Sequence, residues 1–562
     1  MRGVRARQRW IRTPGQQLFA LMLLAVLVLG LVVAGLSWVS GRSDVVGGVD
    51  PRTGTVTLSL ADEPPQLDSS MTADQISSFI LGHVEEGLLR FDQNNHLAPG
   101  VAERWEIGAT GATFWLRDTA KWSDGQPVTA HDFVFAWRNA VDPKSASEYA
   151  NIMFGIKNAE AISAGKLPIT ALGVQAVNDR ELRVEFAYPV PYFAQLTAFN
   201  VFYPIREDFY RATGGRYASS ADTLLYNGPF RMTLWVHGAH IRLEKNPHYW
   251  DRDQISLNVL DFPYFTSDPS ARINLFRDGK IAMTEIGQEN LEEAQLQGWK
   301  INSFMDGSLF YVEFNHRPGR LTRNRNLRKA IQYALDPAEL VNRVIKIPGY
   351  LPGRSLFPMW LDGVHGKFRA EYPVEEITPD PAKARHYLDL AKKELGLTVL
   401  PPLILLTGDT TLAQKEAEYY QETLRRTLGL EVRIDNQIFK QRLAKMLAGD
   451  FDMVSAGWGP DYSDPLTFGD LFTSDNGNNR GEYRNPALDR LVQIARTSTD
   501  PRTRMDAFGK IQQIIVDDAV IVSGYERARL YVIDPVVTGM VRRVTGPDPD
   551  WTRARITSAV SR

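Results

Sequence analysis

The sequence predicts an α/β protein with one transmembrane helix at its N-terminus. Three observations carry this prediction. Strand and helix patterns alternate between residues 402 and 457, the chain is long enough for several domains, and an apolar run follows a group of arginines. With 562 residues, 44% hydrophobic and 23% charged, the composition is that of a globular protein. A chain of this length is expected to form about three domains.

The N-terminal run has the length of a membrane span. It is uncharged from Thr13 to Gly41, and its apolar centre from Leu18 to Trp38 has 21 residues, close to the ~20 that cross a bilayer. A cleavable signal has a shorter apolar region of about 7–15 residues and a small-residue cleavage site. We therefore expect a cytoplasmic basic segment at 1–17, an uncleaved anchor at 18–40 and a linker at 41–53. A long cleaved signal is the alternative, and either reading exports the rest of the chain. The arginines that hold the N-terminus in the cytoplasm are Arg2, Arg5, Arg7, Arg9 and Arg12.

Three segments in the first half of the chain predict secondary structure. Residues 55–61 (TVTLSLA) alternate like a half-buried strand. Residues 112–143 indicate a strand, a turn and a helix, with Thr129 as N-cap and Asp132 at the capping-box position. Residues 230–247 indicate two strands around a short turn, which is typical of a hairpin.

Residues 402–457 give the clearest alternation. Strands are expected at 402–406, 431–436 and 451–457, and helices at 411–428 and 439–447, which Gly429 and Gly449 terminate. Such an order implies parallel strands joined by right-handed crossovers. In open sheets of this kind, ligands bind beyond the carboxyl ends of the strands. The segment AGWGPDYSDP (456–465) begins at such an end.

Composition and motifs argue against an enzyme. The formal charge of −2 does not favour nucleic acid as a partner. The chain has no cysteine, which excludes disulfides and thiol chemistry. It contains no G-x-x-x-x-G-K-[ST], H-E-x-x-H or G-x-S-x-G motif, and its nine histidines are scattered. We expect no cofactor, no metal and no catalytic residue.

Several motifs together resemble the solute-binding proteins of family 5 that serve ABC importers, especially the periplasmic oligopeptide-binding proteins. They occur in order from about residue 55 to 530: E-P-x-x-L-D at 63–68, E-G-L-L at 86–89, A-x-x-W at 102–105, WSDGQPVTAHDF at 122–133, NGPFRMTLW at 227–235, LEKNPHYWD at 243–251, LRKAIQYALD at 327–336 and AGWGPDYSDP at 456–465. The W-S-D-G element is the most specific. Its own residues, Trp122 to Gly125, are interpreted as a structural turn.

The resemblance implies a two-lobed periplasmic-binding-protein fold of three domains. Domain I would be discontinuous, at 54–90, 206–307 and 526–562, domain II an insertion at 91–205, and domain III residues 308–525. The hinge would lie where the chain crosses near 307 and 525. The implied function is the capture of short peptides by a monomer on the periplasmic side of the inner membrane, for delivery to an ABC permease.

The resemblance also implies the site. In oligopeptide-binding relatives, the aspartate of G-W-x-x-D-Y forms a salt bridge with the α-ammonium group of the peptide, and Asp461 matches it. Without the resemblance, Asp461 would be interpreted as a turn former. The main chain at Ala456 and Gly457 is expected to bond to the peptide backbone, and Trp458, Tyr462 and Phe439 to form the walls of the site. Side-chain pockets are expected at Tyr311, Glu313 and Tyr525. The remaining expected ligand contacts are Ser455 and, from the other lobe, Ser78, Phe79 and Ile80.

A departure at two positions leaves alternatives open. Relatives use arginines that meet the peptide carboxylate, and the matching positions here are Met446 and Ser455, which are not basic. Either the C-terminus of the ligand lies elsewhere, or the ligand is longer, modified or without a free carboxylate there. Related proteins of the same fold bind nickel complexes, haem or oligosaccharides, although the aspartate of the motif favours an amine. An anchored peptide sensor that reports ligand to a partner is a further alternative.

Overall fold

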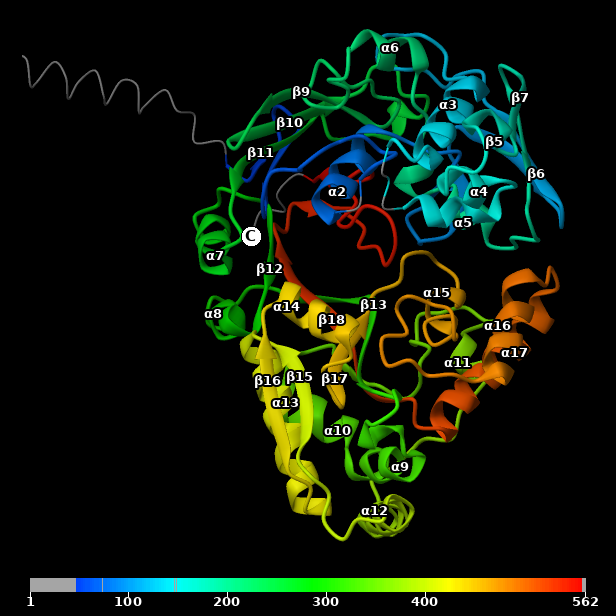
Figure 1. Ribbon diagram of the computed structural model, residues 1–562. Coiled ribbons are helices and arrows are strands. Elements are labelled where there is room, and N and C mark those ends of the chain that lie inside the picture. Colours follow the sequence, from blue (N-terminus) through cyan, green and yellow to red (C-terminus); the bar gives the residue numbers. More distant parts are fainter. Residues whose placement is uncertain (1–46, 73, 146, 148, 558–562) are drawn as a thin grey trace, which may run out of the picture.

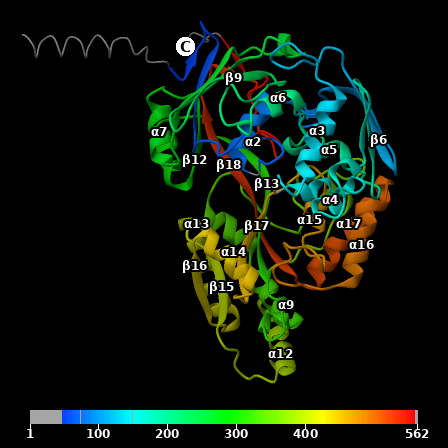
Figure 2. The same cartoon turned by 45° about the horizontal axis from the view of Figure 1, so that its top comes forward.

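The computed structural model describes residues 47–72, 74–145, 147 and 149–557 (Figure 1). Two lobes are visible in both orientations (Figures 1 and 2). We call the part that contains the strands β1–β12 the first lobe, and the part around β15–β17 the second lobe. Helices and strands alternate along the chain, which confirms the expected α/β fold class.

A five-stranded sheet organises the first lobe. Its order is β1 (Val49–Asp50), β2 (Thr55–Leu60), β11 (Val259–Phe265), β10 (His240–Lys245) and β9 (Phe230–Val236). The expected hairpin is confirmed, because β9 and β10 pair antiparallel. The expected linker at 41–53 needs a correction. Its residues 49–50 form β1, which adds to the edge of β2, because the extended chain there can pair with Thr55 and Val56.

Residues 91–205 carry a sheet of their own. It has four strands in the order β5 (Ala102–Ile107), β6 (Gly111–Leu116), β8 (Glu181–Glu185) and β7 (Val174–Asn178). The helix α3 (Ala130–Val141) packs on it and begins with the expected capping box of Thr129 and Asp132. Phe133 and Trp137 of α3 are fully buried. Smaller elements of the first lobe are α2 (Gln75–Val84), β3 (Leu89–Phe91), β4 (Leu97–Pro99), α4 (Ala159–Ser163), α5 (Phe193–Leu196), α6 (Glu207–Ala212), α7 (Pro269–Arg277), α8 (Leu291–Leu296), β19 (Val537–Thr538) and β20 (Arg555–Ile556).

A seven-stranded sheet forms the second lobe and continues into the first. Its order is β12 (Met283–Ile286), β18 (Ile521–Ile533), β13 (Asn302–Phe314), β17 (Met453–Trp458), β15 (Leu403–Gly408) and β16 (Val432–Gln437), with β14 (Leu351–Pro352) also on β18. Both β15–β16 and β15–β17 are parallel, as the alternation at 402–457 predicts. The crossover helices α13 (Thr411–Leu428) and α14 (Phe439–Ala448) end at Gly429 and Gly449, which adopt the left-handed conformation.

The other helices of the second lobe lie around this sheet (Figure 1). They are α9 (Arg325–Ala334), α10 (Pro337–Glu339), a π-helix at Leu340–Ile345, α11 (Phe368–Glu371), α12 (Pro381–Leu395), α15 (Leu466–Gly469), α16 (Pro486–Thr497) and α17 (Pro501–Asp517).

Two long strands connect the lobes. In both views β13 and β18 run from one lobe to the other (Figures 1 and 2). Each has 13 residues, and their mutual register shifts between Met305 and Leu309, where Gly307 adopts φ +81°. Such a conformation is strained for any residue with a Cβ. These strands pass through the positions near 307 and 525 where the hinge is expected.

The lobes also touch away from the strands. One cluster of buried apolar side chains contains residues of 91–205 and of 308–525. At their junction the ring of Tyr192 stacks on that of Tyr462, with 5.4 Å between centroids and 11° between planes. Residues 91–205, which belong to the first lobe, therefore also pack on the second lobe.

The expected anchor at 18–40 lies outside the described residues. Among the helices that the structure does describe, none has the length and apolar character that a membrane span requires.

Candidate functional site

The segment 456–465 lies where the lobes and the connecting strands meet. It starts on β17, whose residues 453–458 pair with β13. Gly457 lies opposite Phe310, and a Cβ there would come within 2.7 Å of the Phe310 ring. Beyond the strand, Gly459 lies beside Ser308 and Pro460 beside Gly307. The loop is thus held against β13, where the hinge is expected, and its Tyr462 stacks on Tyr192 of the other lobe.

Asp461 is a half-buried acid without a counterion. Burial raises the pKa of its carboxyl group to about 6, because a poorly solvated site disfavours the charged form. Its main-chain N–H donates to Thr467 Oγ1 at 3.1 Å, which fixes the loop. Throughout the described chain, no Lys, Arg or His pairs with this carboxylate. The local geometry therefore presents an acid that lacks a cation.

Two neighbouring acids show the opposite arrangement. Asp464 accepts two hydrogen bonds from Arg504, at 2.8 and 2.9 Å, and both groups are buried. Asp470 pairs with Arg496 at 3.3 Å. Because these acids already have their cations, only Asp461 of the three is available to a charged ligand.

Aromatic rings surround the loop. Trp458 is half-buried at the end of β17, and its indole N–H donates to Thr467 Oγ1 at 3.4 Å. Tyr462 is stacked on Tyr192 as described above. Phe439, the first residue of α14, is 65% exposed and free to cover a ligand. Trp458 and the Asp461 main chain thus share Thr467 as hydrogen-bond partner, and Phe439 lies at the surface of the second lobe.

The edge of β17 remains unpaired beyond its first two residues. On that side β15 pairs only with Met453 and Val454. The carbonyl of Ser455 accepts from Arg442 Nη1 at 3.0 Å. Alternate residues of a strand direct their main-chain groups to the same side, so Gly457 points its N–H and C=O in the same direction as Ser455. Gly457 is exposed and can receive another strand.

Two arginines near this edge were not among the residues that the sequence predicted for the site. Arg442 lies on α14, and its guanidinium is 5.5 Å from the centre of the Phe439 ring. Arg480 approaches Met446, with 3.9 Å between Nη1 and the sulfur. The signal for Arg442 was its position one helical turn before Met446, where side chains share a face. No comparable signal existed for Arg480, because the tertiary fold alone brings it there.

The expected pocket residues Tyr311, Glu313 and Tyr525 are buried inside the second lobe. Glu313 accepts from the Gly481 N–H at 2.8 Å, and burial raises its pKa to about 7. Tyr525 donates to Glu416 at 2.7 Å and stacks on Phe310. In this structure these three side chains pack within the fold rather than line a pocket.

The expected contacts Ser78, Phe79 and Ile80 lie on α2 of the first lobe. Ser78 is half-buried. Phe79 packs edge-on against Phe262 and lines a cavity of about 190 Å³. Ile80 has no exposed surface, so it contributes to the core of the lobe and not to a wall. The expectation for these positions therefore fits Ser78 and Phe79 better than Ile80.

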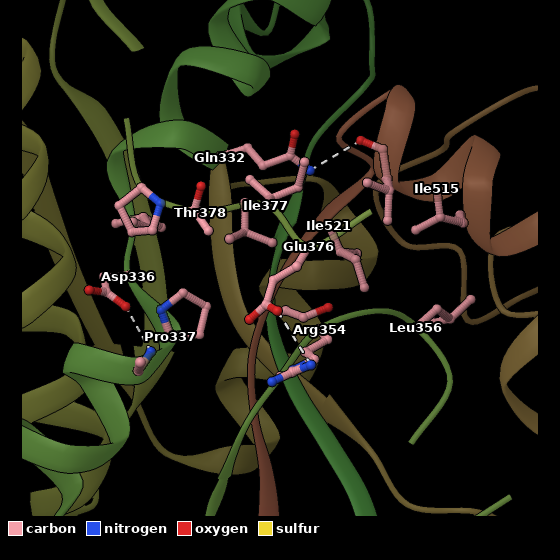
Figure 3. A pocket seen from close by; sticks show the side chains of 17 residues that line it. Gln332, Asp336, Pro337, Arg354, Leu356, Glu376, Ile377, Thr378, Ile515 and Ile521 are labelled. Atoms are coloured by element: carbon pink, nitrogen blue, oxygen red, sulfur yellow. Dashed lines mark hydrogen bonds and ion pairs between the residues drawn. The ribbon is translucent and has the colours of Figure 1, made fainter. Parts of the chain in front are cut away.

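Cavities occur elsewhere, and one lies between the lobes. Its volume is about 630 Å³, and its walls come from Glu285–Glu289 of the first lobe, Asp409–Leu412 of the second and Arg527–Leu530 of β18. Another of about 300 Å³ lies within the second lobe, beside α9 and α17 (Figure 3). There Arg354 pairs with Glu376 at 3.3 Å, and Gln332 donates to the Val516 carbonyl. Since none of the expected ligand contacts lines it, we do not assign it to the ligand.

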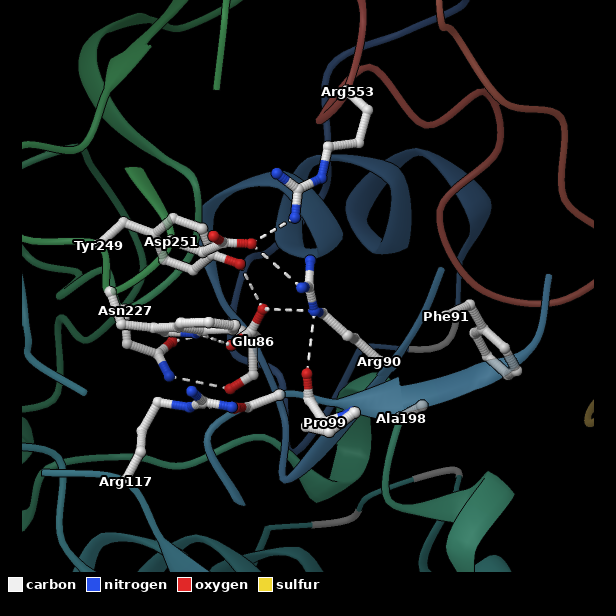
Figure 4. Close-up of polar contacts among 12 residues, drawn as sticks. Glu86, Arg90, Phe91, Pro99, Arg117, Ala198, Asn227, Tyr249, Asp251 and Arg553 are labelled. Carbon is white, nitrogen blue, oxygen red and sulfur yellow. Dashed lines mark hydrogen bonds and ion pairs between the residues drawn. The ribbon is translucent and has the colours of Figure 1, made fainter. Parts of the chain in front are cut away.

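A satisfied polar cluster explains several of the sequence motifs. The buried Glu86 accepts from Tyr249 at 2.5 Å and from Trp250 at 2.6 Å, while Asn227 exchanges two hydrogen bonds with its main chain (Figure 4). Arg117 stacks on Trp250 at 3.5 Å. Glu86, Asn227, Tyr249 and Trp250 come from E-G-L-L, N-G-P-F and N-P-H-Y-W-D, so these motifs join three distant segments of the first lobe, and Arg117 adds a contact from residues 91–205. Likewise Trp122 of W-S-D-G is buried and donates to Asp132 at 3.1 Å, as the structural reading expects.

No metal-binding constellation accompanies the site. Over the residues that the structure describes, no group of three His, Asp or Glu side chains is placed to hold an ion.

Comparisons with known proteins agree with this architecture. Residues 96–480 match the model of the bacterial extracellular solute-binding proteins, family 5. The periplasmic oligopeptide-binding protein OppA of Salmonella typhimurium is 33% identical over 522 residues, which is 90% of this chain and 93% of that protein. The substrate-binding domain of an oligopeptide ABC transporter from Bacillus anthracis superposes with a TM-score of 0.73 at 34% identity, covering 90% and 99% of the two chains. OppA of Listeria monocytogenes bound to peptide gives 0.72 at 30% identity, with the same coverage.

Proposed function

Because the chain belongs to the bacterial extracellular solute-binding proteins of family 5, which are binding proteins and not enzymes, we propose that it captures short peptides between its lobes. It then delivers them to an ABC-type permease. One observation carries the proposal: Asp461, beside the hinge, is a half-buried carboxylate that no described cation neutralises.

The chemistry of Asp461 suits the amino end of a peptide. A desolvated ammonium group needs an opposite charge and acceptors, or its burial is costly. A hydrogen bond between charged groups contributes about 1.5–3 kcal/mol. Haem or an oligosaccharide offers no comparable cation, so the unpaired carboxylate favours a peptide over those ligands.

The edge of β17 supplies the second part of the proposal. A peptide that lies along it adds a strand to the sheet through main-chain hydrogen bonds, which give affinity with little dependence on side chains. Beginning at Asp461 and running past Gly457 toward Ser455, such a peptide is antiparallel to β17. Trp458 and Phe439 then cover it, and closure about β13 and β18 removes it from water.

Isothermal titration tests the function. We expect Ala-Ala-Ala to bind the wild-type protein, N-acetyl-Ala-Ala-Ala to bind far more weakly, and Asp461→Ala to lose the difference between them. Asp475→Ala, an exposed acid farther along the chain, is the control and retains wild-type affinity. Absence of binding by any member of a mixed peptide library, together with binding of a sugar or nickel chelate, rejects peptide capture.

We also propose that residues 18–40 anchor a monomer to the periplasmic side of the inner membrane. The support is the length of the apolar run and the arginines that precede it. Fractionation and N-terminal sequencing of the native protein test this: retention of residue 1 in the membrane fraction is expected, whereas a start near residue 41 means that the segment is cleaved. Light scattering of residues 47–562 tests the monomer.

A further inference from the structure

Glu85 of the first lobe is a buried acid whose carboxylate has no partner. It is the C-cap residue of α2, where its main-chain N–H donates to the Leu81 carbonyl at 2.7 Å, and only 1% of it is exposed. Buried polar groups are nearly always hydrogen-bonded. Of the buried acids that the structure describes, only Glu85 has both carboxylate oxygens shielded from solvent and without a hydrogen-bond donor. These two oxygens therefore point to a group that the isolated chain does not provide.

A second buried acid lies close to Glu85. Asp68 is 6% exposed, and after burial its negative charge is the next cause that raises the pKa of Glu85. It lies in the E-P-x-x-L-D motif after β2, where one of its oxygens accepts from the main chain and the hydroxyl of Ser70, at 3.0 and 2.6 Å. Within the described ranges, no Lys, Arg or His lowers the pKa of either acid. Two like charges in a poorly solvated place are unfavourable unless a proton or a cation lies between them.

Other side chains around Glu85 also present oxygen atoms. The hydroxyl of Ser69 faces the Glu85 carboxylate, is 1% exposed and meets no partner with normal hydrogen-bond geometry in the part of the chain that the structure describes. Burial, and next the charge of Glu85, raise the pKa of the phenol groups of Tyr203, Tyr217 and Tyr226. The Tyr226 hydroxyl donates to a main-chain carbonyl at 2.6 Å, so its own oxygen can still accept. The surroundings of Glu85 thus offer oxygen donors and no cation.

A small cavity leaves room for water beside this group. Its volume is about 50 Å³, and Glu85 and Tyr203 are among the residues that line it. One buried water needs ~10–15 Å³ of such space, so a few waters fit. The two arginines in its wall, Arg90 and Arg543, already pair with acids. The C-terminal end of α2, which carries a partial negative charge, also favours a cation at this place.

We infer that Asp68 and Glu85 bind a calcium ion, with the Ser69 hydroxyl and water as further ligands, and that this ion joins the segment after β2 to the end of α2. Two carboxylates balance the charge of a divalent cation. Ca²⁺ takes about six to eight oxygen ligands in flexible geometry, whereas Mg²⁺ demands a near-octahedral shell. The sequence alone predicts no metal, because only the fold brings these two acids together. The inference is independent of the solute that the protein captures.

Equilibrium dialysis with radioactive Ca²⁺ tests the site on the full chain, purified in detergent and stripped of metal with EDTA. We expect one Ca²⁺ per chain with a Kd on the order of 10⁻⁴–10⁻³ M, the range of extracellular modules. Because the charge of the ligands sets the affinity, Glu85→Gln and Asp68→Asn should each weaken binding at least ~10-fold. Glu106→Gln, an exposed acid on β5, is the control and keeps wild-type binding.

Thermal unfolding gives a second readout, in which the order of stabilities reverses. In EDTA, Glu85→Gln should unfold at the wild-type temperature or above it, because it removes a buried charge without a partner. In about 10 mM Ca²⁺ the wild type should gain ~1–4 °C in Tm, and the variant should gain nothing. Tb³⁺, which occupies oxygen sites in place of Ca²⁺, should emit on excitation of the nearby tyrosines in the wild type and not in Glu85→Gln.

Two results overturn the inference. If the wild type neither binds Ca²⁺ nor gains stability from it, Asp68 and Glu85 share a proton and not a metal ion. If Glu85→Gln and Asp68→Asn bind Ca²⁺ as the wild type does, the ion lies elsewhere. Should either variant fail to fold, the tyrosine-excited Tb³⁺ emission of the wild type and its displacement by Ca²⁺ decide, since they require an ion beside the phenol groups.

Discussion

Glu86 and Asp461 are buried or half-buried acids at two junctions of the molecule, and their surroundings differ completely. Around Glu86 every acceptor meets a donor, from Tyr249, Trp250 and Asn227. Around Asp461 the carboxylate meets no cation in the described chain. The first junction joins distant segments of the first lobe, whereas the second lies in the loop whose Tyr462 stacks on Tyr192 of the other lobe.

The difference shows how to separate motifs that stabilise the fold from motifs that bind. A satisfied polar cluster gains little from a ligand, because its hydrogen bonds already exist. An acid without a partner gains a counterion only when the ligand arrives. By this criterion E-G-L-L, W-S-D-G and N-P-H-Y-W-D serve the fold, and we propose that G-W-x-x-D-Y serves the ligand.

The largest expected effect is at the satisfied junction. Glu86→Ala should lower the free energy of unfolding by ~3–5 kcal/mol, because the donors of Tyr249 and Trp250 lose their acceptor and Arg90 keeps only Asp251 as an acidic neighbour. Urea denaturation followed by tryptophan fluorescence measures this. Glu106→Ala, on an exposed strand position, should cost less than ~0.5 kcal/mol. If Glu86→Ala is as stable as this control, the cluster does not hold the junction.

The next largest effect is expected on ligand binding and not on stability. Asp461→Asn should weaken the binding of a free-amine tripeptide by ~30- to 1000-fold, since the ammonium would be buried without a charge. Stability should stay equal or rise slightly. The pKa of Asp461 is above its ordinary value, so the ionised carboxylate destabilises the folded state at neutral pH. Asp464→Asn is the matched change in the same loop, and it should destabilise the fold by removing the partner of Arg504. If Asp461→Asn and Asp464→Asn lose equal stability, the two acids do not differ in their contribution to the fold.

Sequence patterns predicted the elements that position Asp461 better than the side chains that surround it. The alternation of apolar residues at 402–457 and the glycines at 429 and 449 located β15, α13, β16, α14 and β17 nearly to the residue, because these signals are local. Asp461 was identified from a motif of consecutive residues. Tyr192, Arg442 and Arg480 were missed, since their approach to the site depends on tertiary packing between distant segments.

A third effect depends on pH. If Asp461 binds the ammonium group of the peptide as proposed, binding requires its ionised carboxylate, whose pKa is about 6 in the free protein and which an ammonium partner would lower. Binding therefore releases a proton below that pH, and affinity should fall by up to ~10-fold per pH unit below about 6. Affinity should be nearly constant near pH 7 and fall slightly toward pH 8, because the α-amino group of the peptide, with a pKa of ~7.7–8.0, begins to lose its proton. Titrations of a free-amine tripeptide between pH 4.5 and 8 measure this. Asp470, whose pKa is also about 6, lies nearby; Asp461→Asn separates the two, because a profile unchanged by that variant assigns the proton to another group.

The smallest expected effect concerns the contact that joins the two lobes beside Asp461. Tyr192→Ala removes the ring stacked on Tyr462, and such pairs contribute ~0.5–1.5 kcal/mol beyond buried area. If peptide binding draws on closure of the lobes, this loss should weaken affinity by ~2- to 10-fold. Tyr387→Ala is the matched control, because Tyr387 stacks on Tyr333 at 5.7 Å within the second lobe alone. That variant should lose similar stability without a change in affinity. Equal affinities for the two variants would mean that the interlobe stack only supports the fold, so the unpaired carboxylate and not the closing contact sets the strength of binding.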